Sequence, residues 1–122
     1  MKNINEVPSG KQYIVQRYLA EPFLIDRLKF DFRLYVLMTS CSPLRLFLYN
    51  DGLSRFSTEP YELPENQNIS DIYMHLTNYS INKHNENFIQ GNYSSTGETG
   101  HKRSIKAVFK LLQNQGINTH RI

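Results

Sequence analysis

The sequence predicts an α+β fold, in which an antiparallel β-meander is followed by one clear helix near the C-terminus. Charged and apolar residues alternate at 29–33, and apolar side chains continue at every second position to Met38. This period of two is typical of a β-strand with one buried face. The Asn-Asp-Gly run at 50–52 predicts a tight hairpin turn. Apolar residues at helical spacing within 104–115 predict an amphipathic helix.

Each expected element is bounded by a local signal. The expected strands are 13–19, 29–40, 45–49 and 53–58, and the expected helix is 104–115. A leader loop at 1–12 contains a Pro-Ser-Gly turn signal. Pro22 ends the first strand, and Pro43 marks the turn between the second and the third. The Gly- and Ser-rich run 91–100 predicts a flexible loop, and Gly116 is expected to cap the helix.

Length and composition limit the classes of protein that the chain can belong to. Its 122 residues suit one small domain, and seven Phe and eight Tyr supply enough apolar area for a core. The net charge of +3 permits an acidic partner without requiring nucleic acid. Cys41 is the only cysteine, which excludes an internal disulfide and fits a reducing compartment such as the cytosol. No run is apolar enough for a membrane span, and residues 1–12 lack the apolar stretch of a signal peptide.

The charged face of the main strand is the most unusual feature of the sequence. Lys29, Asp31 and Arg33 recur about 7 Å apart along one strand face. Such a charge ladder can bind an anionic ligand such as a polyphosphate, although a solvated outer face is the commoner explanation. Arg55 joins this cluster if the third strand pairs nearby, or else serves as the cross-strand partner of an acid.

Two further segments have side chains suited to a nucleotide. His75, Thr77 and Asn78 can donate hydrogen bonds to phosphate oxygens, although the segment alone favours a polar turn with a structural histidine. Residues 16–19 can line an adenine pocket, but by themselves they favour an ordinary strand. The four histidines have no metal-ligand spacing, and the chain contains no Gly-rich phosphate loop. The basic residues around the first turns and polar face of the helix are Lys102, Arg103, Lys106 and Lys110. They can meet an acidic peptide, but a solvated helix face is the commoner explanation.

Five ordered blocks of sequence together resemble the tubulin tyrosine ligase-like family. These blocks are residues 16–18, 22–26, 29–37, 51–58 and 74–83. Residues 81–88 and the later Lys102-Arg103 are similar to the polyglutamylase branch. The resemblance implies a partial ATP-grasp domain, with 1–122 as the central part of the catalytic domain. It also implies a ligase that uses ATP to convert a carboxylate to an acyl phosphate, which the amine of glutamate then attacks.

The resemblance assigns roles to particular residues. The positions matching the adenine-binding hinge are Gln16, Arg17, Tyr18 and Leu19. The positions matching other nucleotide contacts are Lys29, Asp31, His75, Thr77 and Asn78. Arg33 and Arg55 match catalytic arginines near the γ-phosphate and the acyl phosphate. Phosphoryl transfer requires such cations around developing negative charge. The Gly-rich loop is expected upstream of Tyr13 and the magnesium ligands downstream of the helix, so no metal ligand is assigned and the chain alone is expected to be inactive.

The resemblance also implies partners and leaves alternatives. The expected partners are free glutamate and the acidic C-terminal tails of tubulin or microtubules, with no nucleic acid and no membrane. The expected location is the cytoplasm and the cytoskeleton, with the cilium or basal body as candidates. A tubulin glycylase or tyrosine ligase is one alternative, and a non-catalytic truncated paralogue that binds microtubules or nucleotide is another. A sheet that binds single-stranded RNA has little support, because the Phe residues of the main strand are expected to face the core.

Overall fold

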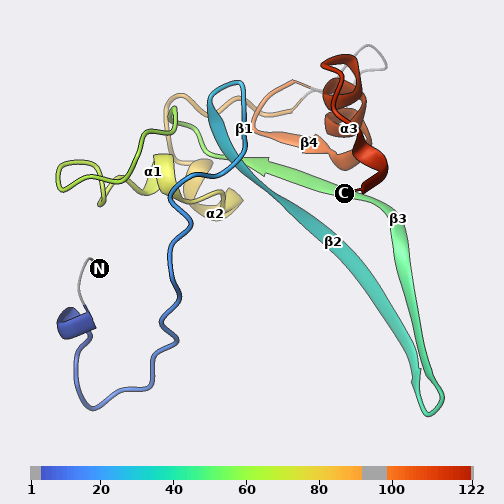
Figure 1. Cartoon of the computed structure of the whole chain (residues 1–122), viewed down its shortest axis with the longest axis horizontal. Coiled ribbons are helices and arrows are strands. Elements are labelled where there is room, and N and C mark those ends of the chain that lie inside the picture. The colour runs from blue at the N-terminus through green and yellow to red at the C-terminus, as the bar shows by residue number, and fades with distance from the viewer. Residues whose placement is uncertain (1–3, 92–98, 122) are drawn as a thin grey trace.

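The computed structural model describes residues 4–91 and 99–121 as a curled antiparallel sheet with a helix against it (Figure 1). The sheet order is β1-β2-β3-β4, with β1 at Leu24–Ile25, β2 at Leu28–Cys41, β3 at Leu44–Phe56 and β4 at Lys102–Ser104. The helices are α1 (Ile72–His75), α2 (Tyr79–Asn82) and α3 (Ile105–Asn114), and the 3-10 turns are η1 (Ile4–Glu6) and η2 (Thr119–Arg121). The antiparallel sheet and the C-terminal helix confirm the predicted α+β class.

The long β2–β3 hairpin turns at Ser42-Pro43, as predicted, with a cis peptide bond between these residues. The hairpin predicted at 50–52 is wrong, because β3 runs through this segment without turning. The register passes from Leu34 opposite Gly52 to Val36 opposite Leu48, so residues 49–51 lie opposite Tyr35 as a β-bulge. The three strands expected between 29 and 58 are therefore two.

Other differences concern short segments. The strand expected at 13–19 does not form within the described residues, because no neighbouring strand offers it cross-strand partners. The leader loop contains the turn η1, and the expected loop 91–100 lies mostly outside the described residues. The strand β4 was not predicted, because its residues were assigned to the surroundings of the helix. It pairs with the last part of β3.

The core lies between the first half of the hairpin and α3. Four side chains form its centre and are at most 3% exposed: Ile25, Phe56, Val108 and Leu112. Phe30 stacks on Phe56, and Phe32 packs edge-to-face on Phe109 of the helix. The Phe residues of the main strand thus face the core as predicted. Burial of this apolar surface is the main stabilising contribution of the contact between sheet and helix.

The helix α3 confirms the predicted element and both of its ends have capping interactions. The Ser104 hydroxyl accepts a hydrogen bond from the Ala107 amide at 3.1 Å, which satisfies one of the unpaired donors of the first turn. Gly116 has φ of +80° and follows the C-cap. The Gly116 and Ile117 amides donate to the carbonyls of Gln113 and Leu112. These two bonds form a Schellman motif, which requires a residue with positive φ after the C-cap.

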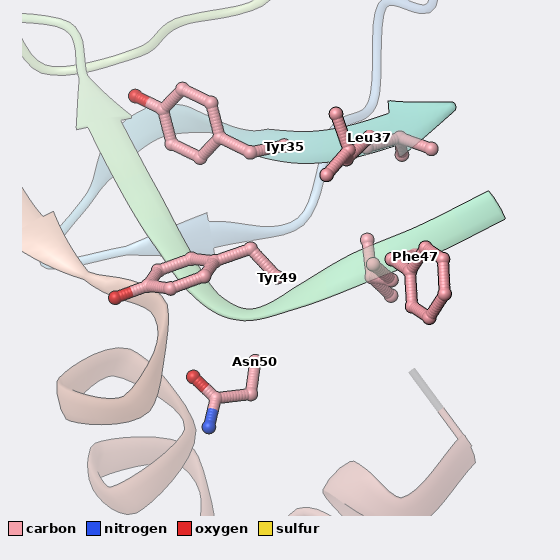
Figure 2. A pocket seen from close by; sticks show the side chains of 7 residues that line it. Tyr35, Leu37, Phe47, Tyr49 and Asn50 are labelled. Atoms are coloured by element: carbon pink, nitrogen blue, oxygen red, sulfur yellow. The ribbon is translucent and has the colours of Figure 1, made fainter. Parts of the chain in front are cut away.

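The outer half of the hairpin, residues 34–49, projects away from the core as an arm (Figure 1). Its large apolar side chains are all about half exposed or more: Leu34, Tyr35, Val36, Leu37, Met38, Leu44, Leu46, Phe47, Leu48 and Tyr49. Figure 2 shows Tyr35 and Leu37 of β2 beside Phe47 and Tyr49 of β3, which line an open groove of about 740 Å³. The expectation of one buried face along the main strand is therefore correct at Phe30 and Phe32 and wrong beyond them.

Candidate functional site

The ammonium group of Lys29 lies at the centre of a small polar cluster. Its Nζ donates to the Tyr18 hydroxyl and to the His75 carbonyl oxygen, each at 3.0 Å. The same nitrogen lies 4.4 Å from the centroid of the Tyr18 ring, within the range of a cation–π interaction. Burial is the largest effect on Lys29 and lowers the pKa of its ammonium group. These contacts join three segments in which the sequence predicted nucleotide contacts.

His75 completes this cluster and has both ring nitrogens occupied. The Tyr18 hydroxyl lies 2.8 Å from Nδ1, and Nε2 lies 3.1 Å from the carbonyl oxygen of Asn68. Because a carbonyl only accepts, Nε2 donates to it, and in a neutral imidazole Nδ1 then accepts from the Tyr18 hydroxyl. The neighbouring Tyr61 packs edge-to-face on the imidazole, and burial raises the pKa of Tyr61 to about 12. His75 therefore supports Tyr18 and Lys29, and direct contact of its ring with a ligand stays a prediction.

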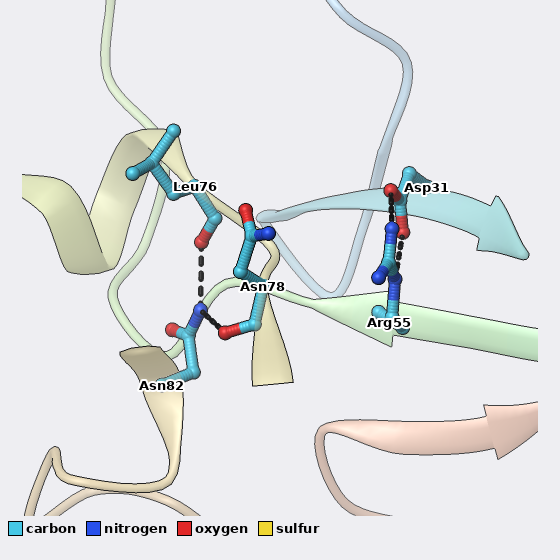
Figure 3. Close-up of polar contacts among 5 residues, drawn as sticks. All are labelled: Asp31, Arg55, Leu76, Asn78 and Asn82. Carbon is cyan, nitrogen blue, oxygen red and sulfur yellow. Dashed lines mark hydrogen bonds and ion pairs between the residues drawn. The ribbon is translucent and has the colours of Figure 1, made fainter. Parts of the chain in front are cut away.

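Asp31 and Arg55 form a bidentate ion pair across β2 and β3 (Figure 3). The two residues are direct neighbours in the strand register, and Nε of Arg55 lies 2.9 Å from Oδ1 of Asp31. The hydrogen bond to this carboxylate is the main reason that the pKa of Arg55 is raised. Arg55 therefore joins the charge ladder, and it does so as the cross-strand partner of Asp31, so both interpretations of this residue hold. The pair fixes the plane of the guanidinium.

A pocket of about 220 Å³ opens beside this ion pair. Arg33, Arg55 and Thr77, all predicted site residues, line it together with Lys102. The remaining lining residues are Tyr35, Leu53, Phe56, Tyr79, Asn82, Phe88 and His101. The structure thus brings together, at one concave surface, cations from β2, β3 and β4 and a hydroxyl from the segment between α1 and α2. Such a pocket suits an anionic group.

Asn82 holds the segment that carries Thr77 and Asn78 in place, and the sequence did not indicate it. It is 1% exposed, and its Oδ1 accepts hydrogen bonds from the amide and the hydroxyl of Thr58. Its Nδ2 donates to the carbonyls of Leu76 and Asn78 (Figure 3). All the hydrogen-bonding positions of the Asn82 side-chain amide are used, which connects this segment to the end of β3.

Lys102 and His101 are also members of the site that the sequence did not identify. The prediction that the basic residues before the helix form a solvated face is wrong for Lys102, which lines the pocket, and for Arg103, which is 9% exposed. Lys102 lies opposite Arg55 in the register between β3 and β4. Burial is the largest effect on His101 and lowers the pKa of its imidazole, whose Nδ1 accepts a hydrogen bond from the Ile89 amide. A strand of three residues gives no periodic signal in the sequence.

The other predicted residues lie outside the pocket. Gln16, Arg17 and Leu19 are exposed on the N-terminal segment. Asn78 is exposed, and its side chain makes no capping hydrogen bond to the start of α2. Their contacts with a nucleotide stay predictions. Residues 4–91 and 99–121 contain no cluster of three or more His, Cys, Asp or Glu side chains that fits a metal ion. Over the same residues, no helix is long and apolar enough to cross a membrane.

The fold and the site define a small α+β unit with a pocket on its charged sheet face, lined by the cations Arg33, Arg55 and Lys102. The chain belongs to the tubulin-tyrosine ligase family, whose model matches residues 1–122. This assignment confirms the resemblance seen in the sequence and implies the ATP-grasp fold. The sheet and helix described above are part of that fold.

Three relatives illustrate how the match is distributed. The chain is 48% identical to a "Probable beta-tubulin polyglutamylase" of Tetrahymena thermophila, over 99% of the chain and 10% of the relative. It is 54% identical to "Tubulin polyglutamylase TTLL7" of Xenopus tropicalis, over 92% of the chain and 12% of the relative. It is 45% identical to "Tubulin polyglutamylase TTLL6" of Mus musculus, over 99% of the chain and 14% of the relative. The chain therefore spans about a tenth to a seventh of the length of these relatives.

Proposed function

We propose that the chain forms the central part of an ATP-dependent ligase that adds glutamate to glutamate side chains in tubulin tails. The main support is the pocket in which Arg33 and Arg55 meet Thr77 and Lys102, because these residues come from segments far apart in sequence. The similarity to named polyglutamylases supports glutamate as the added amino acid. Microtubules, and with them the cilium or basal body, are the proposed location.

In the proposed reaction, the cationic side chains of the pocket stabilise the negative charge that develops on the reacting groups. ATP transfers its γ-phosphoryl group to the carboxylate of the acceptor glutamate, and ADP leaves. The amine of the incoming glutamate then attacks the acyl carbon, an amide bond forms, and the carbon–oxygen bond to phosphate breaks. Arg33 and Arg55 stabilise the phosphoryl oxygens in both steps, and Lys102 adds a third cation for an anionic group. Lys29 and Asp31 are the proposed contacts to the nucleotide, beside Gln16, Arg17, Tyr18 and Leu19 for adenine.

We assign no magnesium ligand among the residues that the structure describes. The described residues contain no cluster of acidic or imidazole side chains that fits such an ion. The role that we propose for this chain is to bind and orient anionic groups through Arg33, Arg55 and Lys102. We expect the purified 122-residue chain to incorporate no glutamate into tubulin when ATP, magnesium and glutamate are supplied. Incorporation by the chain alone would contradict this expectation.

A chimera tests the proposed function directly. The 121 matching residues of the Mus musculus relative are replaced by this chain, and ATP-dependent incorporation of radiolabelled glutamate into tubulin is measured. We expect activity in the chimera and a loss of about a hundredfold or more in kcat/KM for Arg55→Met. Arg45→Met is the matched control, because Arg45 is an exposed arginine on the arm.

The outcomes of this experiment separate the alternatives. An inactive chimera that is folded and binds nucleotide favours the non-catalytic paralogue. Incorporation of glycine or tyrosine in place of glutamate favours a glycylase or a tyrosine ligase. Equal activity of Arg55→Met and Arg45→Met would contradict the assignment of the pocket as the reaction site.

A further inference from the structure

Arg103 is a buried cation that faces away from the pocket. Its Nη2 lies 2.8 Å from Oδ2 of Asp26, and its Nε donates to the Gly100 carbonyl at 2.9 Å. Its guanidinium carbon lies 4.4 Å from the centroid of the Phe56 ring, which is part of the core. The side chain of Arg103 is 10% exposed, whereas that of Asp26 is 52% exposed. A buried guanidinium with one carboxylate, one carbonyl and one aromatic ring as partners is held in a single orientation.

The partner of Arg103 belongs to an unusual turn. Asp26 and Arg27 connect β1 to β2 with φ of +55° and +62°, a left-handed conformation that non-glycine residues seldom adopt. Asn-Gly is the preferred sequence for a two-residue turn of this kind. Non-glycine residues in this conformation persist where surrounding contacts fix them, and they concentrate at functional sites. Here the Asp26 carboxylate is fixed by Arg103, and the Arg27 carbonyl accepts a hydrogen bond from the Tyr61 amide at 2.8 Å.

The anchored side chain determines which way its neighbour points. Successive side chains of a strand lie on opposite faces of the sheet, and a shift by one residue would exchange the faces. The strand β4 has three residues, and so has few main-chain hydrogen bonds to fix its register. Arg103 is held on the core face over Phe56, so Lys102 must lie on the pocket face, opposite Arg55.

We propose that Arg103 is a positioning residue that holds Lys102 in the pocket by joining β4 to the β1–β2 turn through Asp26. The same turn leads into the start of β2, which carries Lys29 and Asp31. The ion pair between Arg103 and Asp26, which are 77 positions apart, therefore fixes the position of Lys102 relative to the start of β2. The proposal rests on the proposed function, in which Lys102 meets the anionic ligand.

A double-mutant cycle in the chimera tests this proposal. The variants are Lys102→Met, Arg103→Met and the two combined, and kcat and the KM values for ATP and for glutamate are measured for each. We expect Lys102→Met to lower kcat/KM by about tenfold or more, and Arg103→Met to change the same kinetic parameter in the same direction. The combined variant is expected to be no worse than Lys102→Met alone, because Arg103 acts only through Lys102. Arg103→Lys is expected to restore activity only in part, since an ammonium group cannot reproduce the guanidinium contacts.

Controls separate a positioning role from a loss of folding. Arg27→Met removes an exposed cation from the same turn and should leave both KM values unchanged. If Arg103→Met lowers only the amount of folded protein, or if its effect adds fully to that of Lys102→Met, the proposal is wrong and the proposed function stands. If Lys102→Met has no effect while Arg55→Met abolishes activity, Lys102 has no role in the pocket and the proposal fails with it. If Arg55→Met is also without effect, the proposed function itself is wrong.

Discussion

The two halves of the β2–β3 hairpin are continuous in the chain but differ in what covers them. At the base of the hairpin, residues 28–33 of β2 and 53–56 of β3, one face packs on α3 and the other lines the pocket. In the arm, residues 34–49, apolar side chains at successive positions, and so on both faces, are exposed. Strands that are apolar on both faces are typical of sheets covered on both sides. The base therefore packs against a core within this chain. The arm has the apolar composition of a buried strand pair, but none of the described residues covers it.

Truncating one phenylalanine in each half should give the largest contrast. Phe56 is 1% exposed and Phe47 is 58% exposed. We expect Phe56→Ala to lower the free energy of unfolding of the chain by about 3–5 kcal/mol. Phe47→Ala should change it by no more than about 0.5 kcal/mol. Urea denaturation followed by circular dichroism measures both. Similar losses for the two variants would show that the arm is packed in solution.

The boundary between the halves is marked by Gly52, where the chain has no room for a side chain. A Cβ added there would lie 2.7 Å from the Cδ1 of Ile105 and closer still to the carbonyl oxygen of Arg33. We expect Gly52→Ala to lower the free energy of unfolding by about 1–3 kcal/mol, because the backbone of β2 at Arg33 must shift and the Ile105 side chain must repack. Asn50→Ala, at an exposed position of the bulge, is the matched control. Equal stability of the two variants would contradict the close packing of β2 and α3 around Gly52.

The Asn-Asp-Gly run shows why the sequence predicted the base better than the boundary. The alternation at 29–33 is a local signal, and the structure follows it through Phe32. The conformation at 50–52 is determined by α3 instead. The Asp51 carboxylate accepts hydrogen bonds from the Gly52 amide and from the Lys106 amide in the first turn of the helix. Because Gly52 has no side chain, the side chain of Ile105 can pack directly against its backbone. The contacts with Lys106 and Ile105 join residues about 50 positions apart, and they override the local preference for a turn.

The candidate site shows the same division. Arg33, Arg55 and Thr77 were assigned by resemblance to a family, and the structure places them at one pocket. Lys102 and Asn82 were missed because their places depend on long-range pairing. Lys102 reaches the pocket through its register with Arg55, and Asn82 through hydrogen bonds to Thr58, 24 positions earlier. A pattern within one segment carries no information on such contacts.

A charge added to the arm should show whether the arm promotes self-association of the chain without contributing to its folding stability. We expect Leu37→Lys to reduce self-association of the purified chain, since an exposed two-sided apolar ribbon with free edges promotes pairing between chains. Its free energy of unfolding should change little, because Leu37 is 61% exposed. Analytical ultracentrifugation measures the association. Asn114→Lys adds the same charge at an exposed position of α3, and an equal reduction by this control would assign the effect to net charge.

The smallest expected effect is a pH dependence that comes from the pocket beside the base and not from the arm. Residues 34–49 contain no His, Asp or Glu, whereas His101 lies at the pocket with a lowered pKa caused mainly by burial. A lowered pKa means that the unfolded chain binds this proton more readily than the folded chain. The contribution of neutral His101 to stability is therefore complete above its ordinary pKa of 6.5 and is lost as the pH falls through the lower value of the folded state.

His101→Asn tests this dependence, because an amide oxygen can still accept the hydrogen bond from the Ile89 amide. We expect the thermal midpoint of the natural chain to fall more than that of the variant between about pH 8 and about pH 5. His84→Asn, which removes an exposed histidine, controls for the loss of one imidazole. The same decline in His101→Asn and in the natural chain would mean that His101 does not contribute. The pH dependence would then come from other groups.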